Sequence, residues 1–309
     1  MDKTKNILIC GAGLMGKNIA FVMSSNPNYE VTLYDTVDQE PREAIRKNTK
    51  ELVEKGIISS EEVEDRLKRV HFTTDINNEA VKKADIVIEA VFENMDIKRE
   101  VFKNLEERCS KDTIFCTNSS VMSPSEISKY LKYRDRFVGT HFWNPAHLIP
   151  LVEVIKSDAT REDVAQTMME IFKSVGKKPV LCKKDVPGFI ANRMQHALWR
   201  EAVYVVEQGI ADAKTVDEAV KYSFGLRLPQ LAPLENADMV GIDLTYSIHE
   251  NVLYDLCDSH EPSPYLKKLK TEGKLGFKTG EGFQKWSKEE QEKISSDLNK
   301  YLIKMLYDK

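Results

Sequence analysis

A histidine and a glutamate in the middle of the chain are of the types that a proton-transfer reaction needs. His141 follows the apolar residues 137–140, and Glu153 interrupts a second apolar run, residues 151–155. A turn at Asn144-Pro145 would make these runs adjacent strands and bring the carboxylate to the imidazole, where it can fix the tautomer and raise the basicity of the ring. The pattern therefore predicts a general base. From these residues alone, a loop histidine with an ordinary partner and a surface glutamate remain the alternative.

A glycine-rich turn near the N-terminus predicts a dinucleotide site. The apolar residues 6–10 lead into Gly11-Ala12-Gly13-Leu14-Met15-Gly16, and a helical pattern follows. In such a turn the first glycine permits the bend, the second lets the backbone approach a pyrophosphate, and the third allows close helix–strand packing. Asp35 ends the next apolar run at the spacing typical of a carboxylate that binds a ribose 2′-hydroxyl. Because that carboxylate would repel a 2′-phosphate, NAD is expected in preference to NADP.

Polar residues follow a further predicted strand, residues 113–117. Asn118-Ser119-Ser120 comes at the carboxyl end of that strand, the edge at which open α/β sheets bind ligands. The hydroxyl of Ser120 is therefore a candidate to hold a substrate oxygen. A serine that caps the next turn is the alternative.

The composition is that of an ordinary globular protein. The chain has 309 residues, 41% hydrophobic and 30% charged, and a net charge of −4. Both signs are interspersed, which suggests neither a nucleic-acid tract nor a membrane anchor, and no apolar run approaches the roughly 20 residues that span a bilayer. The five cysteines form no CxxC and offer no metal-ligand spacing, so reduced thiols and no metal are expected. Without a signal-peptide pattern, a cytoplasmic location is expected.

The order of the elements predicts two domains. Predicted strands and helices alternate as far as residue 182, which indicates an α/β domain with a Rossmann-type, doubly wound sheet in residues 1–185. A helical hairpin, about residues 41–69, is inserted in it. Pro187 and Gly188 mark the boundary. Residues 186–309 are predicted to form an all-α domain.

Seven segments together resemble the short-chain L-3-hydroxyacyl-CoA dehydrogenases, and they occur in that family's order. They are Gly11-Ala12-Gly13-Leu14-Met15-Gly16, Glu89-Ala90-Val91-Phe92-Glu93-Asn94, Asn118-Ser119-Ser120, His141-Phe142-Trp143-Asn144-Pro145, Leu151-Val152-Glu153-Val154-Ile155, Asp185-Val186-Pro187-Gly188-Phe189-Ile190-Ala191-Asn192-Arg193 and Lys278-Thr279-Gly280-Glu281-Gly282-Phe283.

The resemblance implies NAD-dependent interconversion of an L-3-hydroxyacyl-CoA and a 3-oxoacyl-CoA. It assigns His141 as the base, Glu153 as its orienting partner, and Ser120 and Asn192 as donors to the substrate oxygen. An imidazole, with an ordinary pKa of about 6.5, suits the transfer of the hydroxyl proton while the carbon gives hydride to the nicotinamide. The resemblance also implies a homodimer formed by the helical domain. The further residues that it places at the cofactor are Glu93, Lys98, Ser120, Asn144 and Lys278.

Three departures from the family leave the substrate open. Acyl-CoA enzymes usually have lysine where this chain has Pro150, and Glu51 and Glu54 lie where the family places lysines against the CoA nucleotide. Carboxylates there would repel CoA phosphates. Arg227 could bind a free carboxylate with two hydrogen bonds, or it could be a surface arginine. The Ile149-Pro150 and Gly-Leu-Arg segments resemble the carnitine and gulonate 3-dehydrogenase branch, so a free 3-hydroxy acid or small polar alcohol is the alternative substrate.

A non-catalytic NAD-binding protein, like the crystallin relatives of this superfamily, is the alternative from another functional class. The intact set of Ser120, His141, Glu153 and Asn192 argues against it. The 3-hydroxyisobutyrate and 6-phosphogluconate dehydrogenases share the glycine pattern but rely on a catalytic lysine. Residues 188–192 offer none.

Overall fold

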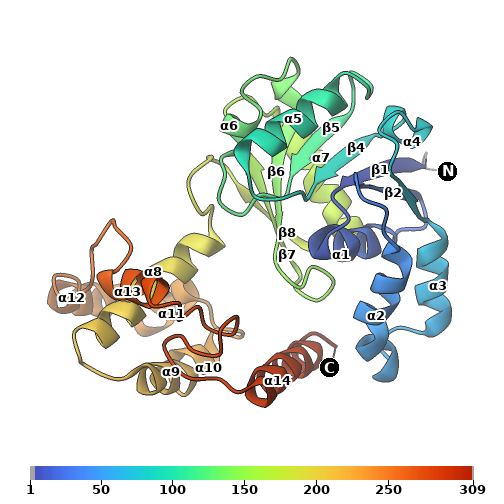
Figure 1. The fold of residues 1–309 in the computed structure, drawn as a ribbon. Helices are drawn as coiled ribbons and strands as arrows, with labels where there is room; N and C mark the ends of the chain where they lie inside the picture. Colours follow the sequence, from blue (N-terminus) through green and yellow to red (C-terminus); the bar gives the residue numbers. More distant parts are fainter. Residues whose placement is uncertain (1–3, 308–309) are drawn as a thin grey trace. The chain divides into compact units, whose positions relative to one another are not determined.

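A computed structural model describes residues 4–307 of the chain (Figure 1). By the contacts among its residues the chain divides into two units, residues 4–192 with 300–307, and residues 193–299. The division falls later than the expected change at residues 185–186, because the segment that starts the long helix α8 is hydrogen-bonded to the sheet of the first unit. Across residues 4–307, no helix is both long and apolar enough to cross a membrane.

The first unit is built on one mixed sheet. Within the described residues its eight strands lie in the order β3-β2-β1-β4-β5-β6-β7-β8, and every neighbouring pair is parallel except β6 and β7. This order, with its reversal at β1, confirms the doubly wound Rossmann-type sheet. The strands are β1 (Lys5–Cys10), β2 (Tyr29–Tyr34), β3 (Val70–Thr73), β4 (Ile86–Glu89), β5 (Ile114–Thr117), β6 (Phe137–Phe142), β7 (Leu151–Lys156) and β8 (Lys178–Cys182).

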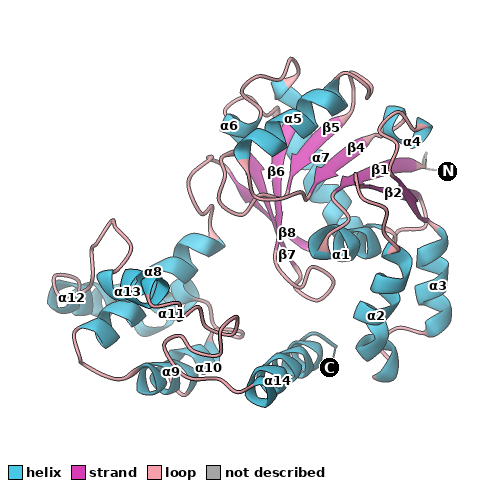
Figure 2. Ribbon diagram, viewed as in Figure 1, coloured by secondary structure: helices cyan, strands magenta, loops and turns pink. Residues whose placement is uncertain are grey.

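Helices cover both faces of the sheet, as Figure 2 shows. Alternate residues of β1 divide between two cores: Ile7 and Ile9 pack with the helices on one face, Leu8 and Cys10 with those on the other. Burial on both faces explains why these strands are continuous apolar runs. The first face is covered by α1 (Leu14–Met23) and α7 (Glu162–Ser174), and the second by α4 (Glu79–Lys82), α5 (Met95–Glu106) and α6 (Pro124–Ile127).

The predicted hairpin is present as α2 (Pro41–Glu54) and α3 (Ser60–Lys68). Pro41 occupies the first turn of α2, and the side chain of Ser59 accepts a hydrogen bond from the Glu62 amide at the start of α3. The apolar sides of both helices join the core that contains α1. The sequence did not predict strand β3, which follows. A strand of four residues, of which only the first is fully buried, gives no clear hydrophobic pattern.

The second unit is helical, as predicted for the C-terminal domain. Helix α8 (Ala191–Glu207) begins in the first unit and continues into the second, and α14 (Lys288–Tyr307) ends in the first. Between them lie α9 (Ala213–Lys221), α10 (Phe224–Arg227), α11 (Pro233–Val240), α12 (Ile242–Val252) and α13 (Pro264–Thr271). Many apolar side chains of this unit are exposed, among them Leu226 at 75%, Leu234 at 81% and Tyr254 at 83%.

Candidate active site

The strands β6 and β7 place His141 directly opposite Glu153. They pair antiparallel, and the register matches these two residues, so the expected turn at Asn144-Pro145 is confirmed. The imidazole Nδ1 lies 2.9 Å from Glu153 Oε2, and both side chains are buried, with 5% and 0% exposed. An ionised carboxylate only accepts hydrogen bonds, so Nδ1 carries the hydrogen and Nε2 is left as the basic nitrogen.

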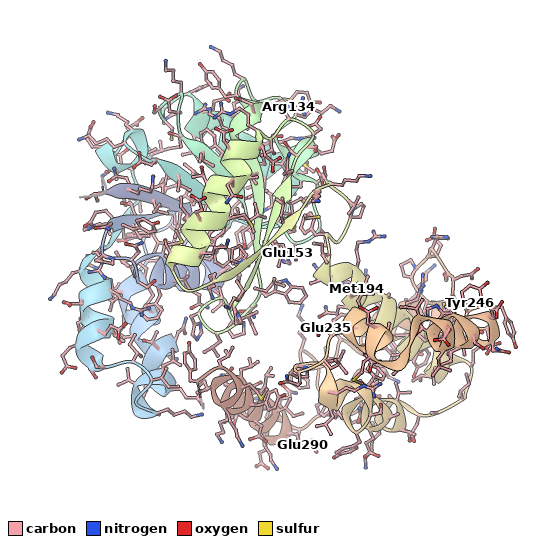
Figure 3. All side chains as sticks on the ribbon, turned by 180° about the vertical axis from the view of Figure 1, so that it is seen from behind. Arg134, Glu153, Met194, Glu235, Tyr246 and Glu290 are labelled. Carbon is pink, nitrogen blue, oxygen red and sulfur yellow. The ribbon has the colours of Figure 1, made fainter. Side chains whose placement is uncertain are left out.

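Four donors hold the Glu153 carboxylate, which Figure 3 labels. His141 Nδ1 and Trp143 Nε1 donate to Oε2, whereas the amides of Ile190 and Ala191 donate to Oε1 at 2.9 and 3.0 Å. Burial alone would raise the pKa of Glu153, but the hydrogen bonds from His141, the two amides and Trp143 outweigh it, and the pKa is lowered. The carboxylate is therefore held as an anion next to the imidazole.

The segment before α8 turns sharply to reach this carboxylate. Gly188 and Phe189 both have positive φ, 76° and 51°, and the second value is uncommon for a residue with a side chain. Phe189 is buried, with its ring 5.8 Å from the imidazole of His141. The turn thereby aims the first free amides of α8 at Glu153.

Ser120 and Asn192 meet in the first unit. The Asn192 side-chain amide donates to the carbonyl oxygen of Ser120 at 3.2 Å, and Asn192 follows directly on the residues that bind Glu153. Ser120 is exposed. The capping role that the sequence left open for it belongs to neighbours, since the hydroxyls of Ser119 and Ser123 accept from the Met122 and Glu126 amides.

The glycine-rich turn forms an open cradle at the N-terminus of α1. Gly11 has φ 102°, and a side chain on it would meet the backbone of Ala90, while one on Gly16 would collide with the carbonyl of Gly11. Nothing lies within 4 Å of the place where a side chain of Gly13 would be, and no side chain caps α1. Asp35 accepts a hydrogen bond from the Ala12 amide at 2.7 Å. Free amides, open space and a carboxylate beside the turn fit a dinucleotide.

A buried charge network lies at the same edge of the sheet. The ammonium of Lys98, 1% exposed, lies 2.7 Å from Glu89 on β4 and 3.1 Å from Glu93. Glu93 also accepts hydrogen bonds from the Ser119 hydroxyl and the Ser120 amide. Burial raises the pKa of Glu89 despite the nearby Lys98. From its local sequence alone, Lys98 resembles a surface lysine. Glu89 could have been singled out by one signal, its charge inside an apolar run.

Another buried lysine was missed altogether. Lys177, just before β8, donates from its ammonium to the carbonyls of Ala146 and Ile149 in the loop between β6 and β7. That loop carries Asn144, which is exposed. Lys177 therefore anchors the loop that joins β6 to β7.

Two further predicted residues, Arg227 and Lys278, lie in the second unit. Arg227 ends the short helix α10, and Lys278 lies between α13 and α14; both are exposed. The four residues brought together within the first unit are Ser120, His141, Glu153 and Asn192.

Two family models match nearly the whole chain. Residues 6–186 match the 3-hydroxyacyl-CoA dehydrogenase NAD binding domain, and residues 188–286 match the C-terminal domain of the same enzymes. The mitochondrial hydroxyacyl-coenzyme A dehydrogenase of Homo sapiens is 36% identical over 91% of this chain and 91% of its own length. The 5-formyl-3-hydroxy-2-methylpyridine 4-carboxylate 5-dehydrogenase of Mesorhizobium japonicum is 31% identical, covering 97% and 96%.

Solved structures of both kinds of enzyme share the fold. A crystal structure of 5-formyl-3-hydroxy-2-methylpyridine 4-carboxylic acid 5-dehydrogenase, described as an NAD+-dependent dismutase, matches with a TM-score of 0.88 at 31% identity, covering 97% of this chain and 96% of that one. The (S)-3-hydroxybutyryl-CoA dehydrogenase from Ralstonia eutropha matches with a TM-score of 0.77 at 30% identity, covering 93% and 100%.

Proposed function

This chain belongs to the 3-hydroxyacyl-CoA dehydrogenase family, and we propose that its His141–Glu153 pair carries the proton transfer of an NAD-dependent interconversion of a hydroxyl and a carbonyl group. The observation that carries the proposal is the buried cross-strand contact, 2.9 Å between Nδ1 and Oε2. It fixes the tautomer that leaves Nε2 free to accept a proton.

The proton moves as follows in the oxidative direction. Nε2 of His141 takes the hydroxyl proton of the substrate, and Glu153, held by four donors, stabilises the imidazolium that forms. Bound NAD supplies the acceptor for the hydride. The Ser120 hydroxyl and the Asn192 amide are the donors proposed for the substrate oxygen, and the hydrogen bond from the Asn192 side chain to the Ser120 carbonyl keeps the two residues close. In reduction the imidazolium returns the proton.

The cofactor is NAD, and the proposed binding residues lie around the open turn. The amides that begin α1, at Leu14 and Met15, would receive the pyrophosphate, with Gly13 leaving the space for it. Asp35 would bind the ribose. The positions proposed to complete the site are Gly11, Gly16, Glu93, Lys98, Ser120, Asn144 and Lys278.

The first candidate substrate is an L-3-hydroxyacyl-CoA, oxidised to the 3-oxoacyl-CoA, which would place the protein in fatty acid metabolism. The support comes from the matched domains and from relatives such as the human hydroxyacyl-coenzyme A dehydrogenase, aligned over nine tenths of both chains.

A free carboxylic acid is the second candidate, and features of α2 favour it. Glu51 pairs with Lys55 at 3.4 Å and Glu54 with Lys50 at 3.5 Å, so each cation near the end of this helix is matched by a carboxylate. A surface neutralised in this way offers little attraction to CoA phosphates. Pro150 adds no cation. The TM-score of 0.88 with an enzyme for a pyridine carboxylate points the same way, and Arg227 is the residue proposed to bind the carboxylate.

We also propose that the protein is a homodimer in the cytoplasm. The exposed apolar side chains of α10, α11 and α12, such as Leu226, Leu234 and Ile242, favour association. Cys10 and Cys116 are buried thiols, which fits a reducing compartment.

A steady-state panel with purified protein tests the function and separates the substrates. Absorbance of NADH would be followed with acetoacetyl-CoA in reduction, and with carnitine, gulonate and free 3-hydroxybutyrate in oxidation; 5-formyl-3-hydroxy-2-methylpyridine 4-carboxylate would be tested as well. Efficient turnover of acetoacetyl-CoA excludes the free-acid proposal. Turnover of the free acids alone excludes the acyl-CoA proposal. Tight NADH binding without turnover of any compound would favour a non-catalytic protein.

A further inference from the structure

One oxygen of Glu153 receives two hydrogen bonds from neighbouring rings. Oε2 lies 2.9 Å from His141 Nδ1 and 3.3 Å from Trp143 Nε1. The indole and imidazole rings lie 5.5 Å apart, between centroids. Trp143 follows the end of β6, so the same chain segment brings both donors to a single acceptor atom.

A shared acceptor couples the two donors. Each hydrogen bond to a carboxylate stabilises its negative charge, so the carboxylate attracts a further positive charge or proton less strongly. The imidazolium form of His141 is the form that the Oε2 charge stabilises most. The indole N–H must therefore reduce the stabilisation of that form, while it also keeps the carboxylate from rotating.

We propose that Trp143 is a positioning residue that acts through Glu153 to lower the proton affinity of His141. The inference rests on the proposed function, because the base it adjusts is the base of that reaction. A phenylalanine at this position would keep an aromatic ring in part of the same space but could not donate to Oε2. The lowered proton affinity of His141 is therefore due to the indole N–H.

Two sets of charged side chains on neighbouring segments have hydrogen-bond or ion-pair partners of their own. The segment before α8 contributes Asp185, whose carboxylate accepts from the Ser123 hydroxyl and the Ser125 amide. The Ser120 loop adjoins the network of Glu89, Glu93 and Lys98, in which the ammonium is shared by two carboxylates. Neither group is changed when Trp143 is replaced, so a change in His141 titration would report the lost indole donor.

The test is an NMR titration of the histidine ring hydrogens in the full-length protein, without cofactor or substrate. The His141 signal is identified among the six histidines by its absence in His141→Gln. In Trp143→Phe the His141 signal should titrate at a higher pH than in the wild type, by at most about 1 unit, since one ordinary hydrogen bond sets the upper limit. Trp286→Phe, the same replacement in the second unit, should leave it unchanged.

Trp143→Leu is the second variant, and it also lacks the donor. It should show the same upward shift, and it replaces Trp143→Phe if that protein does not fold. No shift in the folded variant or variants, or a shift to lower pH, would overturn the proposal. A loss of activity without a shift would also overturn it and would make Trp143 a packing residue.

Failure of this inference and failure of the proposed function are distinguishable. The NMR titration needs no turnover, so an unshifted signal in an active enzyme removes only the role of Trp143. If wild-type protein turns over no compound of the panel, the proposed function fails whatever the titration gives.

Discussion

At the scale of single residues, the proposed chemistry depends on the carboxylate of Glu153, which has two sets of partners. Through Oε2 Glu153 orients His141, the proposed base, and through Oε1 it binds the amides at the start of α8. Asn192, a proposed substrate donor, lies one residue beyond the second of these amides. The proposed base and the proposed oxygen-binding residue are therefore positioned by the same side chain.

Glu153→Gln is expected to damage both functions. An amide has one acceptor oxygen where the carboxylate has two, so its NH2 group must face either the His141 N–H or the backbone amides. We expect kcat to fall roughly 10²-fold or more, within the range lost when a base is disabled, and the thermal midpoint to fall as well. Glu162→Gln, on the exposed start of α7, is the matched control. An unchanged kcat in the Glu153→Gln variant would remove Glu153 from the mechanism.

Sequence predicted the contact of the site that joins two adjacent strands, and it missed the contacts made by buried lysines. His141 and Glu153 lie on neighbouring strands joined by a short loop, so apolar runs and a turn were enough to pair them. The contacts of Lys98 with Glu89 and of Lys177 with the loop carbonyls depend on packing between separate elements. No spacing rule predicts such contacts, and the burial of a lysine leaves no local pattern.

At the scale of elements, the loop between β6 and β7 depends on its anchor. Lys177→Met would leave the carbonyls of Ala146 and Ile149 without this donor, and an unpaired buried acceptor costs about 1–3 kcal/mol. The free energy of unfolding in urea should fall by that amount relative to Lys178→Met, an exposed neighbour. Equal stability of the two variants would show that the loop does not depend on the lysine.

The loop between β6 and β7 also makes the stability of the folded protein decrease as the pH falls into the acidic range. Burial, with a contribution from the charge of Lys177, lowers the pKa of His147 from 6.5 to about 4. As pH falls below 6.5 the unfolded chain takes up a proton that the folded protein does not accept until about pH 4, so stability is lost across that window. Thermal midpoints of the wild type should fall more steeply between these pH values than those of His147→Leu. Parallel curves would contradict this account.

At the scale of the whole molecule, the second unit has too little core for its apolar content. Among residues 193–299, Leu269 is the only hydrophobic residue that is buried, whereas side chains such as Leu234 and Tyr254 are more than four-fifths exposed. Sedimentation equilibrium at micromolar concentration should give twice the chain mass of 35.4 kDa. A monomer at that concentration would refute the dimer.

The central claim is that His141 is the base of an NAD-dependent hydride transfer, and the measurement that tests it most directly compares His141→Gln with the wild type. For the compound of the panel that the wild type turns over fastest, kcat of the variant should be lower by roughly 10² to 10⁴-fold. Its dissociation constant for NADH, measured by fluorescence, should be unchanged. Turnover by His141→Gln at the wild-type rate would contradict the account.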